Sequence, residues 1–282
     1  NTVVSSGNRS INPRLISWEG ETLRTFSFGN HHSFQRYDET STLHLEPAST
    51  CETGPKTSPV VIRDLESEDV IWRWNICDHF TPPRYFQDWD HNNAAERFVG
   101  EDAILLSPRN LSAIMRVNVE TDEIEWMLGY GGVPDDGWNG DFAMDEEDRF
   151  VQQHAPEIME DGHILMFDNA YCEVCLTSET RAQYTAESSR AIEIAYDTED
   201  WSAEVVYEFV PDPPILAPVM GDADRLSNGN TVSTFGRQGV SSSHIIESNP
   251  AGEAVWELSI VEKSIYRSER IDPYFGHVVN DD

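Results

Sequence analysis

The chain has 282 residues, and its 51 acidic and 19 basic side chains give a formal net charge of −32 at pH 7. A surface this acidic repels nucleic acids and anionic membranes, so we expect neither as a partner. With 39% hydrophobic and 10% aromatic residues, the chain can build a large core and is not expected to be disordered. No apolar run is long enough to cross a bilayer, so we expect no membrane insertion.

The only two lysines, Lys56 and Lys263, are far outnumbered by arginines. An acidic surface with so few lysines indicates adaptation to high salt, where screening removes the repulsion between carboxylates. The alternative is an acidic secreted protein of a marine or high-GC bacterium. Since the chain begins with Asn1 rather than Met, we expect a processed mature protein.

In chain order, the first strand signals lie in residues 14–28, which resemble the second and third strands of a sheet unit without its first strand. Residues 60–63 and 70–74 are the next β-prone runs. From there on, units of three short strands follow one another without an amphipathic helix pattern. The strands of these units lie at residues 104–107, 113–118 and 123–128, then 164–167, 191–195 and 205–209, then 231–234, 244–247 and 254–258.

A polar turn that leads into an apolar strand recurs in these units, and repetition at this scale indicates a repeat architecture. The copies are Glu101–Leu106, Glu160–Leu165 and Ser227–Val232, with a weaker fourth copy at residues 42–45. Each unit also ends on a bulky aromatic residue, which we expect to pack against the neighbouring sheet. These aromatic residues are Trp74, Trp126, Tyr207 and Trp256.

Meander sheets at this spacing predict an all-β fold, a β-propeller in which residues 1–282 form a single domain. Four whole units and one composite unit give five blades, or six if one set of strands is missed. We expect residues 265–279 to supply the inner strand that residues 14–28 lack. The N- and C-terminal strands would then pair and close the ring, which removes the exposed sheet edges.

Four cysteines are present, at positions 51, 77, 172 and 175. Their even number predicts an oxidising, secreted or periplasmic location, with Cys51–Cys77 and Cys172–Cys175 as the simplest of three pairings. A Cys-x-x-Cys sequence can instead be a redox motif or half of a zinc site, but a second pair at similar spacing is missing.

Histidines precede three of the four copies of the repeat. His31 and His32 lie ahead of the weak copy, His91 ahead of the first and His154 ahead of the second, whereas Met220 occupies this place in the third. If the copies are blades around one axis, we expect these residues to face each other in one place. Packing alone does not require histidine at several equivalent positions, so the pattern favours a functional site there.

Several motifs occur in order along the chain. They are Asp88–Asn92, Ser107–Ser112, Ile124–Gly129, Gln153–His154, Leu165–Asn169, Met220–Gly221 and Arg225–Thr231. Together they resemble the bacterial and archaeal arylsulfotransferase (aryl-sulfate sulfotransferase) family, over a region from about His31 to Arg270. The resemblance implies a six-bladed β-propeller with its active site at the central channel, and sulfuryl transfer between phenols without a nucleotide cofactor.

In that family a histidine is the transient nucleophile, and His, Arg and Asn side chains hold the sulfate oxygens. The resemblance implies catalytic roles for His91 and His154, and the repeat adds His32. The implied substrate-binding residues are Arg109, Asn169 and Asn92. We expect a small-molecule or anionic substrate, no cofactor and no metal, although clustered imidazoles with Asp90 keep a metal site open as an alternative.

The third copy departs from the family pattern, because the nucleophilic histidine expected before Gly221 is replaced by Met220. A thioether cannot perform the acid–base part of an imidazole. Either His32 or His91 then takes the sulfuryl group, or the reaction has changed. One alternative is a polysaccharide lyase that uses His91 or His154 as its base, with Arg109 neutralising a uronate. Another is a binding propeller without catalysis.

Overall fold

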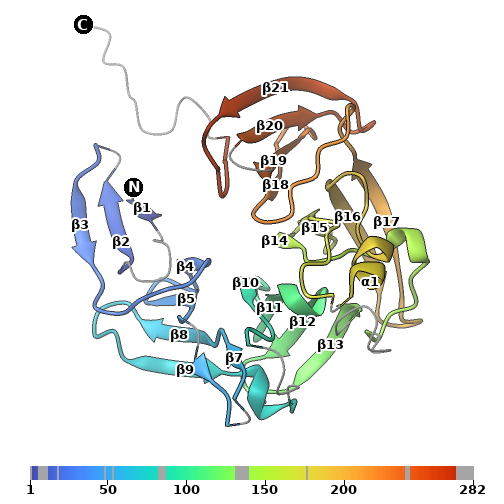
Figure 1. Ribbon diagram of the computed structural model, residues 1–282. Helices are drawn as coiled ribbons and strands as arrows, with labels where there is room; N and C mark the ends of the chain where they lie inside the picture. Colours follow the sequence, from blue (N-terminus) through green and yellow to red (C-terminus); the bar gives the residue numbers. More distant parts are fainter. Residues whose placement is uncertain are drawn as a thin grey trace, which may run out of the picture.

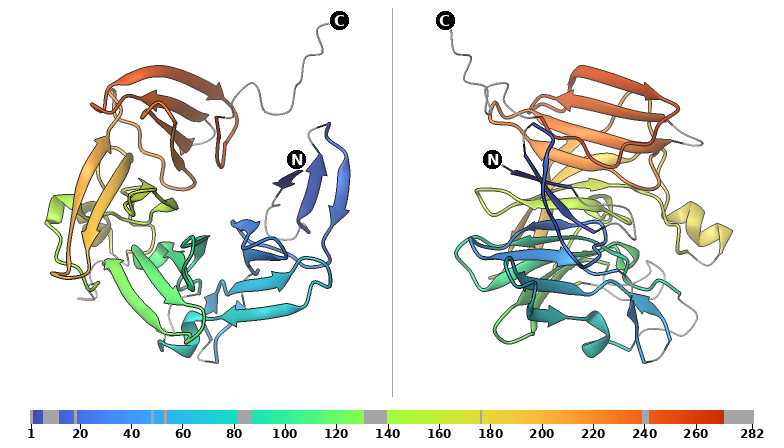
Figure 2. Two further views of the ribbon diagram at one scale, coloured as in Figure 1. Left: turned by 180° about the vertical axis from the view of Figure 1, so that it is seen from behind. Right: turned by 90° about the vertical axis from the view of Figure 1, so that its left-hand side faces the viewer.

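The computed structural model describes residues 2–5, 12–17, 19–47, 49–52, 54–81, 87–130, 140–175, 177–238 and 242–270. Figure 1 looks along the axis of a ring in which five sheets follow one another in sequence order. This is the arrangement of a β-propeller, and the predicted all-β class is confirmed. The first strand of each sheet lies nearest the centre of the ring (Figures 1 and 2).

Four of the five sheets are antiparallel meanders of four strands. The first of these contains β4 (Phe34–Arg36), β5 (Ser41–Leu45), β8 (Val60–Asp64) and β9 (Val70–Trp74). The second contains β10 (Asn92–Arg97), β11 (Ala103–Pro108), β12 (Ala113–Asn118) and β13 (Ile124–Gly129). The third contains β14 (His154–Ile158), β15 (Ile164–Asp168), β16 (Arg190–Asp197) and β17 (Ser202–Phe209). The fourth contains β18 (Asp222–Arg225), β19 (Thr231–Gln238), β20 (Ser242–Ser248) and β21 (Ala254–Val261).

The remaining elements are smaller. A three-stranded sheet contains β1 (Thr2–Ser5), β2 (Arg14–Ser17) and β3 (Thr22–Thr25), and a hairpin contains β6 (Ser49–Thr50) and β7 (Lys56–Thr57). Helix α1 (Ser178–Gln183) projects from one face of the ring in the side view of Figure 2. Among the described residues, no helix is long and apolar enough to cross a membrane.

The outer three strands of each four-stranded unit were predicted from the sequence, but the innermost strands were not. In the expected scheme the histidines lay in turns ahead of three-stranded units. In the structure, β10 begins directly after His91 and β14 begins at His154 itself. The inner strands therefore carry the candidate site at their starting ends.

The core lies between adjacent sheets. Every residue of β11 and of β15 is buried, because both faces of these strands are covered by neighbouring blades. Burying one large apolar side chain contributes roughly 1.5–3 kcal/mol, so these strands fix the blades in place. The inner strands are thereby held rigidly around the centre.

The aromatic residues that end the units follow the predicted packing in three blades out of four. Trp74 and Trp126 are 2% and 4% exposed, and Tyr207 is also buried. Trp256 on β21 is 50% exposed, because no described strand packs over this face of the last sheet. The last blade is therefore the exception in the described part of the chain.

The expected pairing of the two chain ends is not found among the described residues. The first sheet contains only strands from the N-terminal part, and β1 takes the inner place that residues 265–279 were expected to fill. Residues 265–270 form no strand, and residues 271–279 lie outside the described part.

Both predicted disulfides, Cys51–Cys77 and Cys172–Cys175, are present. The first joins the β6–β7 region to the segment after β9. The second closes a short loop after β15. Their presence fits folding in an oxidising compartment.

Candidate active site

Three of the predicted positions share an unusual backbone conformation ahead of an inner strand. His32, His91 and Met220 have φ angles of 58°, 44° and 67°, in the left-handed region that non-glycine residues rarely adopt. In the remaining four-stranded blade, the residue with this conformation ahead of the inner strand is Gln152, with a φ of 57°. His154 follows two residues later, within β14. We expected His154 to be the blade equivalent of His32 and His91, and the structure shows that it is not.

The residue after Met220 must be a glycine for steric reasons. Gly221 has a φ of 134°, and a Cβ atom at this position would lie 2.2 Å from the ring of Phe167. The backbone at the head of β18 therefore passes directly over a core side chain of β15. This close packing fixes the place of Met220 beside the site.

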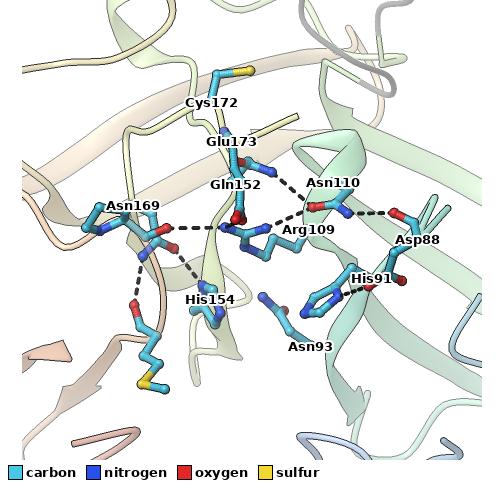
Figure 3. Close-up of polar contacts among 12 residues, drawn as sticks. Asp88, His91, Asn93, Arg109, Asn110, Gln152, His154, Asn169, Cys172 and Glu173 are labelled. Carbon is cyan, nitrogen blue, oxygen red and sulfur yellow. Dashed lines mark hydrogen bonds and ion pairs between the residues drawn. The ribbon is translucent and has the colours of Figure 1, made fainter. Parts of the chain in front are cut away.

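His154 is held in one tautomer by Asn169. The side chain of His154 is buried, and its Nδ1 lies 2.6 Å from Oδ1 of Asn169 (Figure 3). The amide nitrogen of Asn169 donates to the carbonyl oxygens of Ala217 and Met220, each at 2.7 Å. Because both amide hydrogens are used, Oδ1 must accept from Nδ1–H of His154. The neutral ring then has its lone pair on Nε2, which has no hydrogen-bond partner among the described residues.

The ring of His154 is kept neutral by its surroundings. Burial lowers its pKa well below the ordinary value, and the nearby positive charge of Arg109 lowers it further. A neutral imidazole with a lone pair on Nε2 is the form that attacks an electrophile. His154 therefore has the protonation state and tautomer that a histidine nucleophile requires.

Arg109, predicted to bind substrate, makes three hydrogen bonds within the protein. Its guanidinium is buried and donates to Oδ1 of Asn110 at 2.9 Å, to Oε2 of Glu173 at 3.0 Å and to the carbonyl oxygen of Pro218 at 3.2 Å. Only its Nε is buried without a partner. Arg109 thus mainly contributes positive charge and rigidity to the site, and few of its hydrogen-bond donors are free.

A disulfide-closed loop brings an acidic residue to Arg109. Glu173 stands between Cys172 and Cys175, and its backbone N–H donates to Oε1 of Gln152 at 2.5 Å. Its carboxylate, 56% exposed, pairs with Arg109 (Figure 3). The positive charge of the guanidinium is therefore partly balanced at the edge of the site.

The other histidines form a second group. The Nε2 atoms of His32 and His91 are 3.1 Å apart, and Nδ1 of His91 lies 2.6 Å from Oδ2 of Asp88. The ring centroid of His31 is 3.9 Å from that of His32. One ring nitrogen from each of these three histidines lies within 4.8 Å of the other two, so the group can hold a metal ion. The rings of His32 and His154 are 6.4 Å apart, which brings all the predicted catalytic histidines into one region.

Two residues of the site were missed at the level of the sequence. Tyr266 stacks on His32 with ring centroids 5.5 Å apart, and its hydroxyl lies 2.6 Å from Nδ1 of His32. Arg267 is an exposed residue whose guanidinium carbon lies 5.4 Å from the centroid of the Tyr266 ring, and its Nη2 donates a long hydrogen bond, 3.5 Å, to the carbonyl oxygen of Asn93. Both belong to the segment expected to form a strand, and no repeated motif marks them.

Asn92, also predicted to bind substrate, lies at the start of β10 but is turned into the protein. Its amide nitrogen donates to the carbonyl oxygen of Ser58 at 3.0 Å and to Oδ2 of Asp90 at 2.8 Å. Burial raises the pKa of Asp90 to about 7. These contacts fix the head of β10, and through it the position of His91.

A family model described as arylsulfotransferase (ASST) matches residues 19–267. Among solved structures, the chain is similar to a protein of unknown function from Bacteroides caccae, with a TM-score of 0.51 and 9% identity over 92% of this chain and 78% of that chain. It is also similar to the periplasmic gluconolactonase PpgL of Pseudomonas aeruginosa, with a TM-score of 0.42 and 10% identity over 93% and 67% of the two chains. For BamB of Moraxella catarrhalis the TM-score is 0.37, with 8% identity over 91% and 75%. No curated protein matches the sequence. At these identities the structural likeness concerns the fold alone.

Proposed function

The chain belongs to the arylsulfotransferase family, and from this premise we propose that it transfers a sulfuryl group from an aryl sulfate to a phenol, with His154 as the group that carries it. The observation that supports His154 is its fixed tautomer: Asn169 holds the proton on Nδ1 and leaves the lone pair on Nε2. This role falls to His154 because Met220 cannot form such an intermediate.

In the first step, Nε2 of His154 attacks the sulfur atom of the aryl sulfate. The S–O bond to the aromatic ring breaks, and its electron pair leaves with the phenolate oxygen. The imidazole now carries the sulfuryl group on Nε2 and a proton on Nδ1, so positive charge develops on the ring. Asn169 Oδ1 accepts a stronger hydrogen bond from this ring, which stabilises the intermediate.

In the second step, an acceptor phenol attacks the same sulfur atom and loses its proton. The N–S bond breaks, its electron pair returns to Nε2, and the first phenolate ends as a phenol. One proton therefore moves from the acceptor to the leaving phenol over the two steps, and no cofactor is consumed. Splitting the transfer in this way replaces one difficult step by two easier ones.

Arg267 is the side chain best suited to hold the sulfate oxygens. The residue is exposed, its guanidinium carbon lies 5.4 Å from the centroid of the Tyr266 ring, and its positive charge acts on both His32 and His154. Arg109 supplies further positive charge near His154, while three of its donors are used within the protein. A guanidinium on an exposed residue can turn toward an anion more readily than one fixed by three hydrogen bonds to the protein.

The same proposal places the protein outside the cytoplasm in a high-salt environment. Two disulfides need an oxidising compartment, and a net charge of −32 is tolerated best where salt screens it.

Incubation with 4-nitrophenyl sulfate and phenol at high salt tests the function. We expect release of 4-nitrophenol that depends on phenol, and a sulfuryl adduct on the peptide that contains His154 when phenol is left out. The His154→Gln variant should give neither. A Met220→His variant serves as a matched control, because it restores the family residue without altering His154. Transfer that appears only in this variant, or an adduct on another histidine, would contradict the assignment.

A further inference from the structure

The imidazole rings of His31, His32 and His91 lie closer together than hydrogen bonding among them requires. His31 and His32 are neighbours in the chain, and neighbours in an extended segment normally point to opposite sides. The left-handed backbone of His32 interrupts this alternation, so the two ring centroids approach to 3.9 Å. His91 reaches the same place from the next blade, also with a left-handed backbone, and its ring centroid is 5.3 Å from that of His31. Backbone conformations of this kind are retained where they position functional side chains.

The separation of two of these nitrogens matches shared coordination of an ion. Two imidazole nitrogens bound to one tetrahedral zinc at about 2.0–2.1 Å lie roughly 3.3 Å apart. The Nε2 atoms of His32 and His91 are 3.1 Å apart. One nitrogen of His31 completes a set whose members are all within 4.8 Å of one another.

Each ring is held from behind by an oxygen atom at Nδ1. Oδ2 of Asp88 lies 2.6 Å from Nδ1 of His91, and the hydroxyl of Tyr266 lies 2.6 Å from Nδ1 of His32. Oγ of Ser58 lies 3.2 Å from Nδ1 of His31. Metal-binding histidines characteristically donate their second N–H to a carboxylate, hydroxyl or carbonyl oxygen, which fixes the tautomer and orients the ring.

We propose that His31, His32 and His91 bind one divalent transition-metal ion, with Zn²⁺ as the first candidate. Three imidazoles without a coordinating carboxylate suit Zn²⁺, Cu²⁺ or Ni²⁺ and are poor ligands for Mg²⁺ or Ca²⁺. Three protein ligands leave a fourth position open for water or another oxygen ligand. The bound ion takes both Nε2 lone pairs and replaces the hydrogen bond between His32 and His91.

A second group of possible ligands provides an internal control. Asp161, His163 and Glu193 also bring one ligand atom each within 4.8 Å, but Glu193 forms ion pairs with both His163 and Arg225. This group lies at the turn between β14 and β15 and on β16, and Arg225 already balances the charge of Glu193. Substitution of His163 would show whether a metal binds at this group or at the three histidines.

Metal content of the untagged full-length chain tests the proposal. After dialysis against a chelator at high salt, the protein is titrated with ZnCl₂ while binding is followed by calorimetry, and with CoCl₂ while visible absorption is recorded. We expect one ion per chain and the intense visible bands of tetrahedral cobalt. A protein that takes up no zinc, or zinc with no effect on its melting temperature, would overturn the proposal.

Variants locate the ion. His91→Gln should abolish stoichiometric binding, and Asp88→Asn, which keeps the side-chain volume and the fold, should weaken the affinity about 10- to 100-fold. His163→Ala should bind as the unaltered chain does. If His163→Ala loses the ion while His91→Gln keeps it, the ion belongs to the group of Asp161, His163 and Glu193 and the assignment is wrong. None of these measurements uses sulfuryl transfer, so they test the metal site independently of the role proposed for His154.

Discussion

His154 and the group of His31, His32 and His91 occupy one region of the propeller but are held in opposite ways. His154 is buried as a single ring against the neutral amide of Asn169. The other three rings face each other and are held from behind by Asp88, Tyr266 and Ser58. The first arrangement leaves one lone pair on Nε2 of His154, and the second brings one nitrogen of each of three rings within 4.8 Å of the others.

The difference shows that the chemistry of an imidazole is set by the atom opposite its second nitrogen and by its neighbours. A lone buried ring stays neutral and reactive toward an electrophile. A set of rings with oxygen partners is suited to share a cation. We therefore propose different roles for the same residue type a few ångströms apart.

The largest expected effect is on sulfuryl transfer, which should depend on His154 far more than on His91. Replacement of His154 by Gln should lower kcat for sulfuryl transfer by at least about 10³-fold, because the nucleophile is lost. Replacement of His91 by Gln should leave an adduct on His154 detectable by mass spectrometry. His79→Gln is the control, since the ring of His79 stacks on Trp74, with ring centroids 4.8 Å apart, away from both groups. An equal loss of kcat and of the adduct in the His154 and His91 variants would contradict separate roles for the two residues.

The next effect concerns the partner of His154. Asn169→Ala removes the acceptor that fixes the tautomer, and we expect kcat to fall about 10²-fold with little change in KM. Asn228→Ala, in an exposed turn, should behave as the unaltered chain. A change in KM alone would instead indicate that Asn169 binds substrate, the role predicted from the sequence.

A smaller effect is expected at the charge behind His154. Glu173→Gln removes the carboxylate that pairs with Arg109, so the uncompensated guanidinium should lower KM for an aryl sulfate about two- to fivefold. Because Glu173 is largely exposed, the effect should shrink as salt is raised. Glu179→Gln in the exposed α1 is the control, and the readout is KM measured across a salt series. A higher KM for the Glu173 variant would show that the loop helps substrate binding.

The smallest effect concerns stability and involves carboxylates on the inner strands. Burial raises the pKa of Glu96 on β10 to about 7 and that of Asp224 on β18 to about 8, the latter helped by Asp222. An unfolded carboxylate titrates near pH 4, so the folded chain binds more protons between about pH 4 and pH 8. The free energy of unfolding should therefore fall as the pH rises through this window.

The Asp224→Asn variant tests this slope. It should melt a few degrees above the unaltered chain at pH 9 and close to it at pH 5, measured by calorimetry at constant high salt. Glu120→Gln, at an exposed turn, should show no such pH-dependent difference. A parallel shift at both pH values would mean that packing, not ionisation, is responsible.

Much of the fold was predictable because the outer three strands of each blade alternate or are continuously apolar. The inner strands were missed because they are short and polar: β10 reads Asn-Asn-Ala-Ala-Glu-Arg and β18 reads Asp-Ala-Asp-Arg. Strands that line the axis do not need an apolar face toward the centre, so the usual alternation is weak there. The repeat nevertheless led to the right region of the molecule.

The candidate site was predicted in part. The repeat pointed to His32, His91 and His154, which do lie together, but it could not show that Gln152 is the blade equivalent of His91. Tyr266 and Arg267 reach the site from a non-repeating segment, so only the folded chain reveals them. Arg109 and Asn92 carry the right chemistry, but both amide hydrogens of Asn92 and three donors of Arg109 bond to the protein itself.

The shared left-handed turn at His32, His91, Gln152 and Met220 has a consequence for how such proteins diverge. The turn conformation is set by the blade, so the side chain at that position can be exchanged while the backbone stays in place. Mutation can therefore alter the chemistry of one blade at a time without refolding the others. A designer who wanted a new ligand set at the axis would begin with substitutions at these four positions.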